Sequence, residues 1–281
     1  ETEYCLLLCR VGKEGFVAAS RPLITLLTDF GTRDAYVGSM KGVILGLNPG
    51  GNLIDLSHEV PPQDIRAGAL ILAAAAPFFP PGATHLAVVD PGVGSGRRAL
   101  AARARDSYWV GPDNGLFHFI FDPAPDLIIV SLENPAYFRP RVSATFHGRD
   151  IFAPVAAHLS LGVHLERFGP RIADPVLLDL PQPVFGPALI RAEIIAVDHF
   201  GNLVSNLRFA ELTAWLKEAG MRLTAGPLIL TGLARTYAEV APGEFLALEG
   251  SHGFLEIACA RDSAARRLKA GAGLALEIRK A

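Results

Sequence analysis

The chain has 281 residues, of which 50% are hydrophobic and 19% are charged. This composition allows one or two domains with a substantial core and excludes global disorder. The formal net charge is −2 and no long basic run occurs, which argues against a protein that coats nucleic acid.

Residues 1–20 differ in character from the rest of the chain. An apolar run at 6–8 lies between Cys5 and Cys9, but the segment opens with Glu1 and Glu3 and not with the basic residues of a secretory signal. We therefore expect a poorly ordered N-terminal extension. The three cysteines, which include Cys259, fit neither a metal site nor a disulfide framework, and this favours a reducing, cytoplasmic setting.

From residue 21 to about 185, short apolar strands alternate with helical stretches. This alternation predicts an α/β domain with a mostly parallel sheet covered by helices. An apolar run at 67–79 contains Pro77 and is too short to span a bilayer, so no membrane partner is expected. The predicted strands are 23–28, 52–57, 84–89, a hairpin of 100–105 with 107–111, and 127–132. The predicted helices are 34–47, 64–76, 114–121 and 150–161, with Asp34, Asp64 and Asp150 as candidate N-caps.

After residue 171 the sequence pattern changes. Prolines punctuate a linker, and we place the domain boundary near residue 185. In residues 186–281, glycine turns separate short strands, which is typical of a small β-barrel or sandwich. The predicted strands are 189–197, 222–233, 245–248, 255–259 and 274–279, with one helix at 210–219.

The segment 87–98 joins an apolar strand to an acidic residue, a glycine-rich turn and two arginines. Glycine lets backbone segments pack closely, and ligands of α/β sheets bind at strand ends. We therefore expect the Asp90 carboxylate and the Arg97 guanidinium to share one small volume. A proton acceptor beside a cation is suited to activating water. The alternative is an ion pair that only pins a surface turn.

Other polar residues follow other predicted elements. Asp29 closes the first strand, where it either accepts hydrogen bonds from a ribose diol or caps the next helix. His147 precedes a helix and has the near-neutral pKa that proton transfer needs, although a lone histidine is more often structural. His58 is interpreted as a satisfied loop histidine. Asn114 lies in a turn and is a candidate to face a ligand.

Taken in order, the motifs of the chain resemble the S-adenosylmethionine (SAM) hydrolase family, also called SAM hydroxide adenosyltransferases. More distantly they resemble the SAM-dependent fluorinase and chlorinase. The resemblance covers nearly all of residues 23–278. It rests on TDFG at 28–31, DPGVGSGRR at 90–98, PDNG at 112–115, FHGRD at 146–150, DHFGN at 198–202 and GSHGFLEIA at 250–258.

The resemblance implies a Rossmann-like N-terminal domain, a smaller C-terminal β-barrel, and metal-independent hydrolysis of SAM to adenosine and L-methionine without a cofactor. It also implies a homotrimer with active sites at subunit interfaces. The implied catalytic residues, which hold the attacking water, are Asp90, Arg97 and His147. The implied substrate-binding residues are Asp29 at the ribose, Asp198 and Ser251 at the methionine, Asn202 and Tyr237 at the adenine, and also Asn114 and Glu256. The family pattern is broken at His252 and near Ala260.

Other functions stay open at this point. A SAM-dependent halogenase would use chloride or fluoride as nucleophile, but a carboxylate at Asp90 repels a halide. By resemblance, the halogenases carry an uncharged residue there. A non-catalytic SAM or adenosine sensor would need the same recognition groups. A dinucleotide oxidoreductase is disfavoured, because the glycines at 92–96 lack the full fingerprint and follow the third predicted strand.

Overall fold

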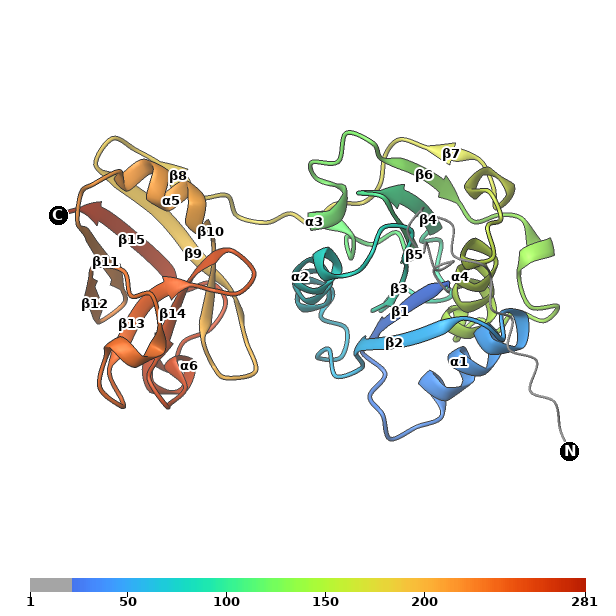
Figure 1. Cartoon of the computed structure of the whole chain (residues 1–281), viewed down its shortest axis with the longest axis horizontal. Coiled ribbons are helices and arrows are strands. Elements are labelled where there is room, and N and C mark those ends of the chain that lie inside the picture. The colour runs from blue at the N-terminus through green and yellow to red at the C-terminus, as the bar shows by residue number, and fades with distance from the viewer. Residues whose placement is uncertain (1–21) are drawn as a thin grey trace, which may run out of the picture. The chain divides into compact units, whose positions relative to one another are not determined.

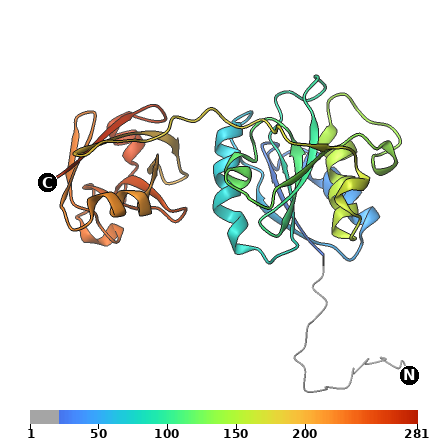
Figure 2. The same ribbon diagram turned by 90° about the horizontal axis from the view of Figure 1, so that it is seen from above.

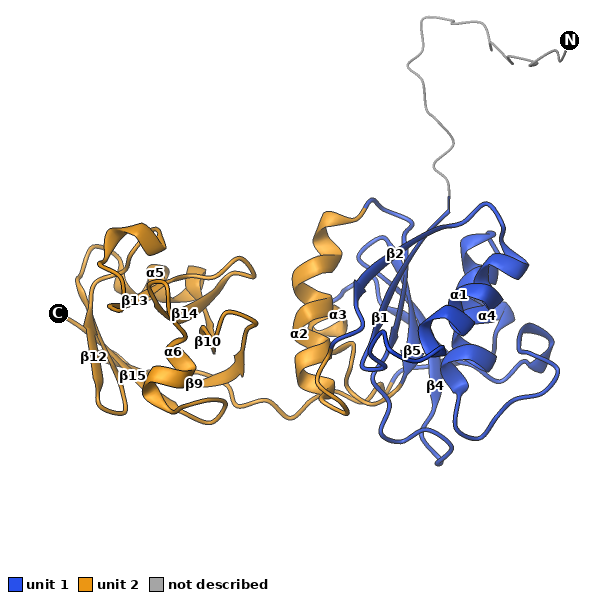
Figure 3. Ribbon diagram, turned by 90° about the horizontal axis from the view of Figure 1, so that it is seen from below, with its two compact units in different colours: residues 1–59, 80–112, 124–173 blue, residues 60–79, 113–123, 174–281 orange. Residues whose placement is uncertain are grey.

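The computed structural model describes residues 22–281 (Figure 1), so the expectation for residues 1–20, with Cys5 and Cys9, lies outside the described residues. The chain divides into two compact units (Figure 3). Unit 1 contains the residues up to 59 together with 80–112 and 124–173. Unit 2 contains 60–79, 113–123 and 174–281. The domain boundary near residue 185 stays a prediction.

Unit 1 is built on a seven-stranded sheet with the strand order β2-β1-β3-β5-β4-β6-β7. Strands β2, β1, β3 and β5 run parallel, whereas β4, β6 and β7 are joined by antiparallel pairing. The sheet is therefore mixed, and the expectation of a mostly parallel sheet is not confirmed. The strands are β1 Leu23–Thr28, β2 Asn52–Ser57, β3 Thr84–Val88, β4 Ala99–Ala104, β5 Ser107–Pro112, β6 Ile128–Ser131 and β7 Arg171–Ile172.

The hairpin between β4 and β5 is the point where the parallel order ends. Its two turn residues, Arg105 and Asp106, have φ values of 53° and 56°. Positive φ at both positions is the geometry of a two-residue hairpin turn. The chain therefore returns directly beside β4 and forms β5 as its antiparallel neighbour, whereas a parallel neighbour would need a crossover connection.

Two helices of unit 1, α1 Tyr36–Leu47 and α4 Ala153–Ser160, lie side by side (Figures 1 and 3). Met40 and Ile44 of α1 are fully buried in the same core as Leu26 of β1. The prediction that Asp34 caps the first helix is wrong, since the N-cap is Ala35 without a side-chain hydrogen bond. Asp150 is not a cap either, because it lies inside the π-helical turn Gly148–Phe152 that precedes α4.

Unit 2 contains α2 Ile65–Ala75 and α3 His118–Phe121, which pack against each other. Asp64 caps α2 as predicted, and its side chain accepts a hydrogen bond from the Ala67 backbone N–H at 2.9 Å. Along residues 22–281 no helix is both long enough and apolar enough to cross a membrane.

The larger part of unit 2 is an antiparallel sheet of eight strands that curls into a barrel-like shape (Figure 2), as expected. Its order is β12-β11-β15-β9-β10-β14-β13, and β8 pairs with β9. The strands are β8 Val184–Phe185, β9 Leu189–Val197, β10 Leu203–Arg208, β11 Met221–Ala225, β12 Leu228–Thr231, β13 Phe245–Glu249, β14 Phe254–Cys259 and β15 Ala275–Lys280. Two helices, α5 Phe209–Leu216 and α6 Ala264–Leu268, accompany them.

Two features of this barrel-like sheet differ from the prediction. The expected strand 222–233 is two strands, since Gly226 with φ of +56° turns the chain between β11 and β12. The strand β10 was not predicted, because Ser205 and Asn206 make its sequence polar. The Ser205 hydroxyl is fully buried and donates to the Leu255 carbonyl at 2.7 Å, so a hydrogen bond offsets the cost of burying this side chain.

Candidate active site

Asp90 and Arg97 form a bidentate ion pair at the two ends of the glycine-rich turn. Arg97 Nε donates to Asp90 Oδ1 at 2.8 Å and to Oδ2 at 3.1 Å, and Arg97 Nη2 also donates to Oδ2. The side chains are only 4% and 10% exposed, respectively. Phe152 lies below the guanidinium, with 5.3 Å between its ring centroid and Arg97 Cζ. The pair is thus fixed in place and shielded from bulk water.

His147 joins this pair through Arg97 Nη2, the same nitrogen that donates to Asp90 Oδ2. Arg97 Nη2 lies 3.1 Å from His147 Nδ1. Arginine has no acceptor atom, so the guanidinium donates this hydrogen bond and Nδ1 accepts it. In the neutral imidazole the proton therefore sits on Nε2. The predicted catalytic residues are thus in contact, with Arg97 in the middle.

The surroundings of His147, burial above all, favour its neutral form. Burial, followed by the positive charge of Arg97, holds the pKa of His147 below its usual value of 6.5. Asp90 and Asp150 act in the opposite direction but are weaker. A neutral imidazole that accepts from Arg97 is therefore the dominant form at neutral pH.

The turn that carries Asp90 touches the loop that carries His147. Gly94 has φ of +77°, and a Cβ atom there would lie 2.4 Å from the Ala144 carbonyl oxygen. Glycine alone allows this approach. The glycine-rich turn is therefore required for the contact between the two loops.

Asp150 anchors the loop before His147. Its carboxylate is fully buried and accepts from the Ser143 backbone N–H at 2.9 Å. Arg149 Nε and Nη2 donate to Asp150 Oδ1 and Oδ2 at 2.7 and 2.8 Å. The Arg139 N–H donates to the Asp150 backbone carbonyl at 2.9 Å. Asp150 thus ties the start of the loop to its end.

Asp29 lies at the same edge of the sheet as Asp90. Strands β1 and β3 are parallel neighbours, and Thr28 at the end of β1 is in register with Val88 at the end of β3. Asp29 directly follows β1 and Asp90 follows β3, so both carboxylates are at the carboxyl edge where α/β sheets bind ligands.

His58 has contacts within unit 1 on both ring nitrogens. Its Nδ1 is 2.8 Å from Thr28 Oγ1, and its Nε2 is 3.0 Å from Asp55 Oδ1, which confirms the structural interpretation of His58.

A second cluster of predicted residues lies in unit 2. The Asn202 backbone N–H and side-chain Nδ2 donate to Asp198 Oδ1 and Oδ2 at 2.7 and 2.9 Å. Asn202 Nδ2 is also 3.5 Å from the Tyr237 hydroxyl oxygen. Gly201 between them has φ of +84°, which forms the tight turn after β9. The turn therefore gathers an acid, an amide and a phenol.

Glu256 belongs to this cluster, and the pKa of its carboxyl group is raised. It is 3% exposed in the middle of β14, and Tyr237 donates a hydrogen bond to it. Burial, and next the negative charge of Asp198, raise the pKa of Glu256 to about 7. His252 Nε2 lies 3.1 Å from Glu256 Oε1, and burial lowers the pKa of His252. Gly250 leaves room for this carboxylate, because a Cβ there would lie 2.1 Å from Glu256 Oε1.

The remaining predicted residues have local surroundings of their own. Asn114 Oδ1 accepts from the Leu116 N–H at 3.2 Å, which is the contact of a turn-forming asparagine. Ser251 is exposed at the turn before β14. In the part of the chain from 22 to 281, no group of three His, Cys, Asp or Glu side chains is arranged to hold a metal ion.

Sequence reasoning missed the supporting roles of Phe152, Asp150 and His252. Phe152 lies five residues after His147. An apolar residue at this position does not by itself predict that the Arg97 guanidinium packs over its ring. Glu256 was predicted only through the resemblance, although a carboxylate in the otherwise apolar run FLEIAC also has to find partners when the strand is buried.

Comparison with known proteins identifies the family of the chain. Residues 24–169 match the family profile described as SAM hydroxide adenosyltransferase N-terminal domain, and residues 192–277 match that of the C-terminal domain. A curated protein of Salinispora tropica named (R)-S-adenosyl-L-methionine hydrolase is 44% identical over 246 residues, which are 85% of this chain and 91% of that protein.

Two further proteins extend the comparison. The crystal structure of a conserved protein from Thermotoga maritima superposes with a TM-score of 0.85 at 37% identity, over 92% of this chain and 100% of that one. The fluorinase of Actinoplanes sp. is more distant, at 26% identity over 300 residues, 94% of this chain and 99% of the fluorinase. The chain therefore belongs to the SAM hydroxide adenosyltransferase family.

Proposed function

We propose that the protein hydrolyses SAM to adenosine and L-methionine. The observation that carries this proposal is the contact of Asp90, Arg97 and His147 at the edge of the sheet where Asp29 also lies. The sulfonium of SAM is already an activated leaving group, so the demanding task is to activate water. A buried carboxylate, a guanidinium and an imidazole in contact are the groups that this task needs.

The proposed reaction is an in-line displacement at ribose C5′. A bond forms between the water oxygen and C5′ while the bond between C5′ and sulfur breaks. The electron pair of that bond stays on sulfur, and methionine leaves as a neutral thioether. The water proton passes to a general base, a transfer that contributes about 10²–10⁴-fold.

We assign the general base to Asp90. His147 Nδ1 already accepts from Arg97, and its Nε2 carries the proton, so the neutral imidazole has no lone pair left to take another. Each carboxylate oxygen of Asp90 keeps acceptor capacity beyond its bonds to Arg97. His147 Nε2–H would then orient the water oxygen, and Arg97 would stabilise hydroxide character as it develops.

The cluster in unit 2 is proposed to recognise the substrate. Asp198 is acidic and suits the amino group and sulfonium of SAM, which are cationic. Glu256, whose pKa is raised to about 7, adds negative charge beside Asp198 only when it ionises. Tyr237, with 47% of its surface exposed, offers a ring on which adenine can stack. Ser251, Asn202, Asn114 and Asp29 would supply the remaining polar contacts to methionine, adenine and ribose.

Family membership further supports a homotrimer with active sites at subunit interfaces. The free, buried Cys259 supports a cytoplasmic setting.

The decisive experiment incubates the protein with SAM in halide-free and in halide-rich buffer and separates the products by chromatography. We expect adenosine and methionine in both, with one ¹⁸O in the 5′-hydroxyl of adenosine when the reaction runs in H₂¹⁸O. A 5′-halogenated adenosine that depends on halide would make the protein a halogenase. Binding of SAM without turnover would make it a sensor.

A further inference from the structure

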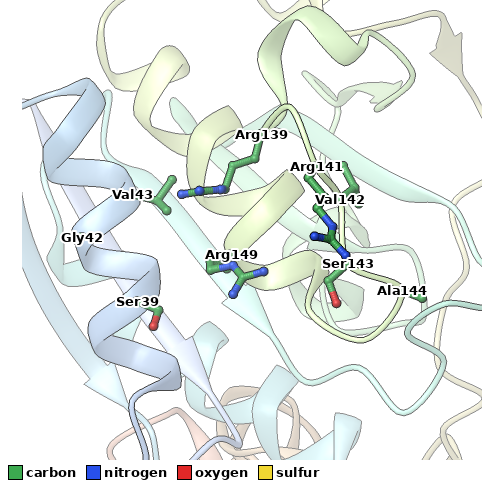
Figure 4. Close-up of a pocket in the computed structure, with 9 residues that line it drawn as sticks. All are labelled: Ser39, Gly42, Val43, Arg139, Arg141, Val142, Ser143, Ala144 and Arg149. Atoms are coloured by element: carbon green, nitrogen blue, oxygen red, sulfur yellow. The ribbon is translucent and has the colours of Figure 1, made fainter.

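The loop that carries His147 also lines a cavity on the surface of unit 1 (Figure 4). The cavity has a volume of about 840 Å³ and lies between helix α1, which contributes Ser39, and the segment 139–149. Arg139, Arg141 and Arg149 all reach into it, and none of the residues that line it is acidic. Neither the proposed catalytic residues nor the substrate-binding residues line this cavity.

The positive charge of the cavity is only partly neutralised. Asp150, which is buried and does not line the cavity, pairs with Arg149 and lies 3.5 Å from Arg139 Nε. Arg141 is exposed and has no ion pair with another residue of the chain from 22 to 281. Three guanidinium groups thus reach into the cavity, and one carboxylate contacts only two of them, so a charge of about +2 is left for a ligand to neutralise.

We propose that this cavity binds a di- or triphosphate anion and that the bound anion acts on the loop of His147. Guanidinium groups bind phosphoryl oxygens in bidentate fashion, and the hydroxyls of Ser39 and Ser143 add neutral donors. The volume is in the range of small-ligand sites and far exceeds what a single halide needs. No aromatic side chain lines the cavity, so the phosphoryl groups and not a base would carry the recognition.

The coupling to His147 follows from the shared arginine. Arg149 holds Asp150, and Asp150 in turn holds the Ser143 N–H at the start of the loop. An anion that takes up Arg149 competes with Asp150 for the same guanidinium. Because Ala144 of this loop rests on Gly94, a change in the loop also reaches the turn of Asp90.

The test measures binding of inorganic pyrophosphate to the full chain by isothermal titration calorimetry at constant ionic strength. Arg141→Ala should weaken binding at least about tenfold, because it removes charge-assisted hydrogen bonds to the phosphoryl oxygens. Arg141→Lys keeps the charge but loses the bidentate geometry of the guanidinium, so its affinity for pyrophosphate should lie between those of wild type and Arg141→Ala. The matched control is Arg171→Ala, an exposed arginine of the same unit that pairs with Glu166, and it should bind as wild type does. ATP compared with adenosine distinguishes an organic phosphate from an inorganic one.

The second part of the test rests on the proposed function and measures turnover of SAM at saturation. Pyrophosphate should lower kcat in wild type and in Arg171→Ala but not in Arg141→Ala. Binding with unchanged kcat would overturn the coupling. The absence of binding to wild type, or equal binding to Arg141→Ala, would overturn the site itself, whether or not SAM is hydrolysed. The site would also be overturned if wild type did not bind pyrophosphate and Arg141→Ala no longer formed oligomers. The arginines would then belong to an interface between copies of the chain.

Discussion

The carbonyl oxygen of Ala144 lies so close to Gly94 that a Cβ on Gly94 would be 2.4 Å from it. Contacts this short do not occur, so a side chain at Gly94 has to push the His147 loop away from the turn of Asp90 and Arg97. We expect Gly94→Ala to lower kcat at least about tenfold, through loss of the near-attack geometry, and to destabilise the fold because φ is +77°.

Gly96 in the same turn provides the matched control for Gly94. A Cβ there meets no atom within 4 Å, and its φ lies outside the left-handed region. Gly96→Ala should keep kcat and thermal stability close to wild type. Equal kcat values for the two variants would show that the contact between the loops does not matter for catalysis.

Asp90→Asn tests the assignment of the general base. The amide keeps the shape of the side chain but cannot take the water proton, so kcat should fall by about 10²–10⁴-fold. The dissociation constant of SAM, measured by calorimetry, should change little, because the proposed substrate-binding groups are elsewhere. Near-normal kcat at saturating SAM would contradict the role of Asp90.

The titration of His147 can be followed by NMR. Burial and Arg97 lower the pKa of His147, so its midpoint should lie below 6.5. In Arg97→Ala the midpoint should move upward, because one of the two lowering causes is gone. The unfolded chain takes up this proton first as pH falls, so the contribution of His147 to stability is lost as pH falls below about 6.5. A midpoint at or above 6.5 in wild type would contradict the lowered pKa of His147.

Glu256 should make the stability depend on pH in the opposite sense. Its pKa is raised from 4.5 to about 7, so between these values the folded protein holds a proton that the unfolded chain has released. The stabilisation is fully present below about pH 4.5 and is lost as pH rises through 7. Glu256→Gln has no such loss.

Urea denaturation at about pH 5 and about pH 8 measures this effect. Relative to wild type, the free energy of unfolding of Glu256→Gln should be larger at the higher pH than at the lower one, because only wild type loses stability as pH rises. Glu218→Gln, at an exposed position of the same unit, controls for the loss of one carboxylate. A difference between Glu256→Gln and wild type that does not change with pH would show that Glu256 ionises normally.

The sequence was sufficient for the elements that have strong local signals. Strands β1, β2 and β9 have the predicted bounds, because apolar runs with turn residues at both ends are read directly from the chain. Local signals failed where a tertiary contact decided the outcome. Strand β10 is polar in sequence and is a strand because it pairs with β9 and β14. The mixed sheet likewise depends on the antiparallel pairing of β4 with both β5 and β6.

The same division holds for the two clusters of polar residues. The motifs determined by themselves that a carboxylate, an arginine and a histidine were available, since their residue types and order are properties of the chain. Only the tertiary structure decided that Arg97 stands between Asp90 and His147, because 50 residues separate Arg97 from its imidazole partner. It also decided the charge state of Glu256, since a pKa depends on burial and on the distance to Asp198, and neither is written in the order of residues.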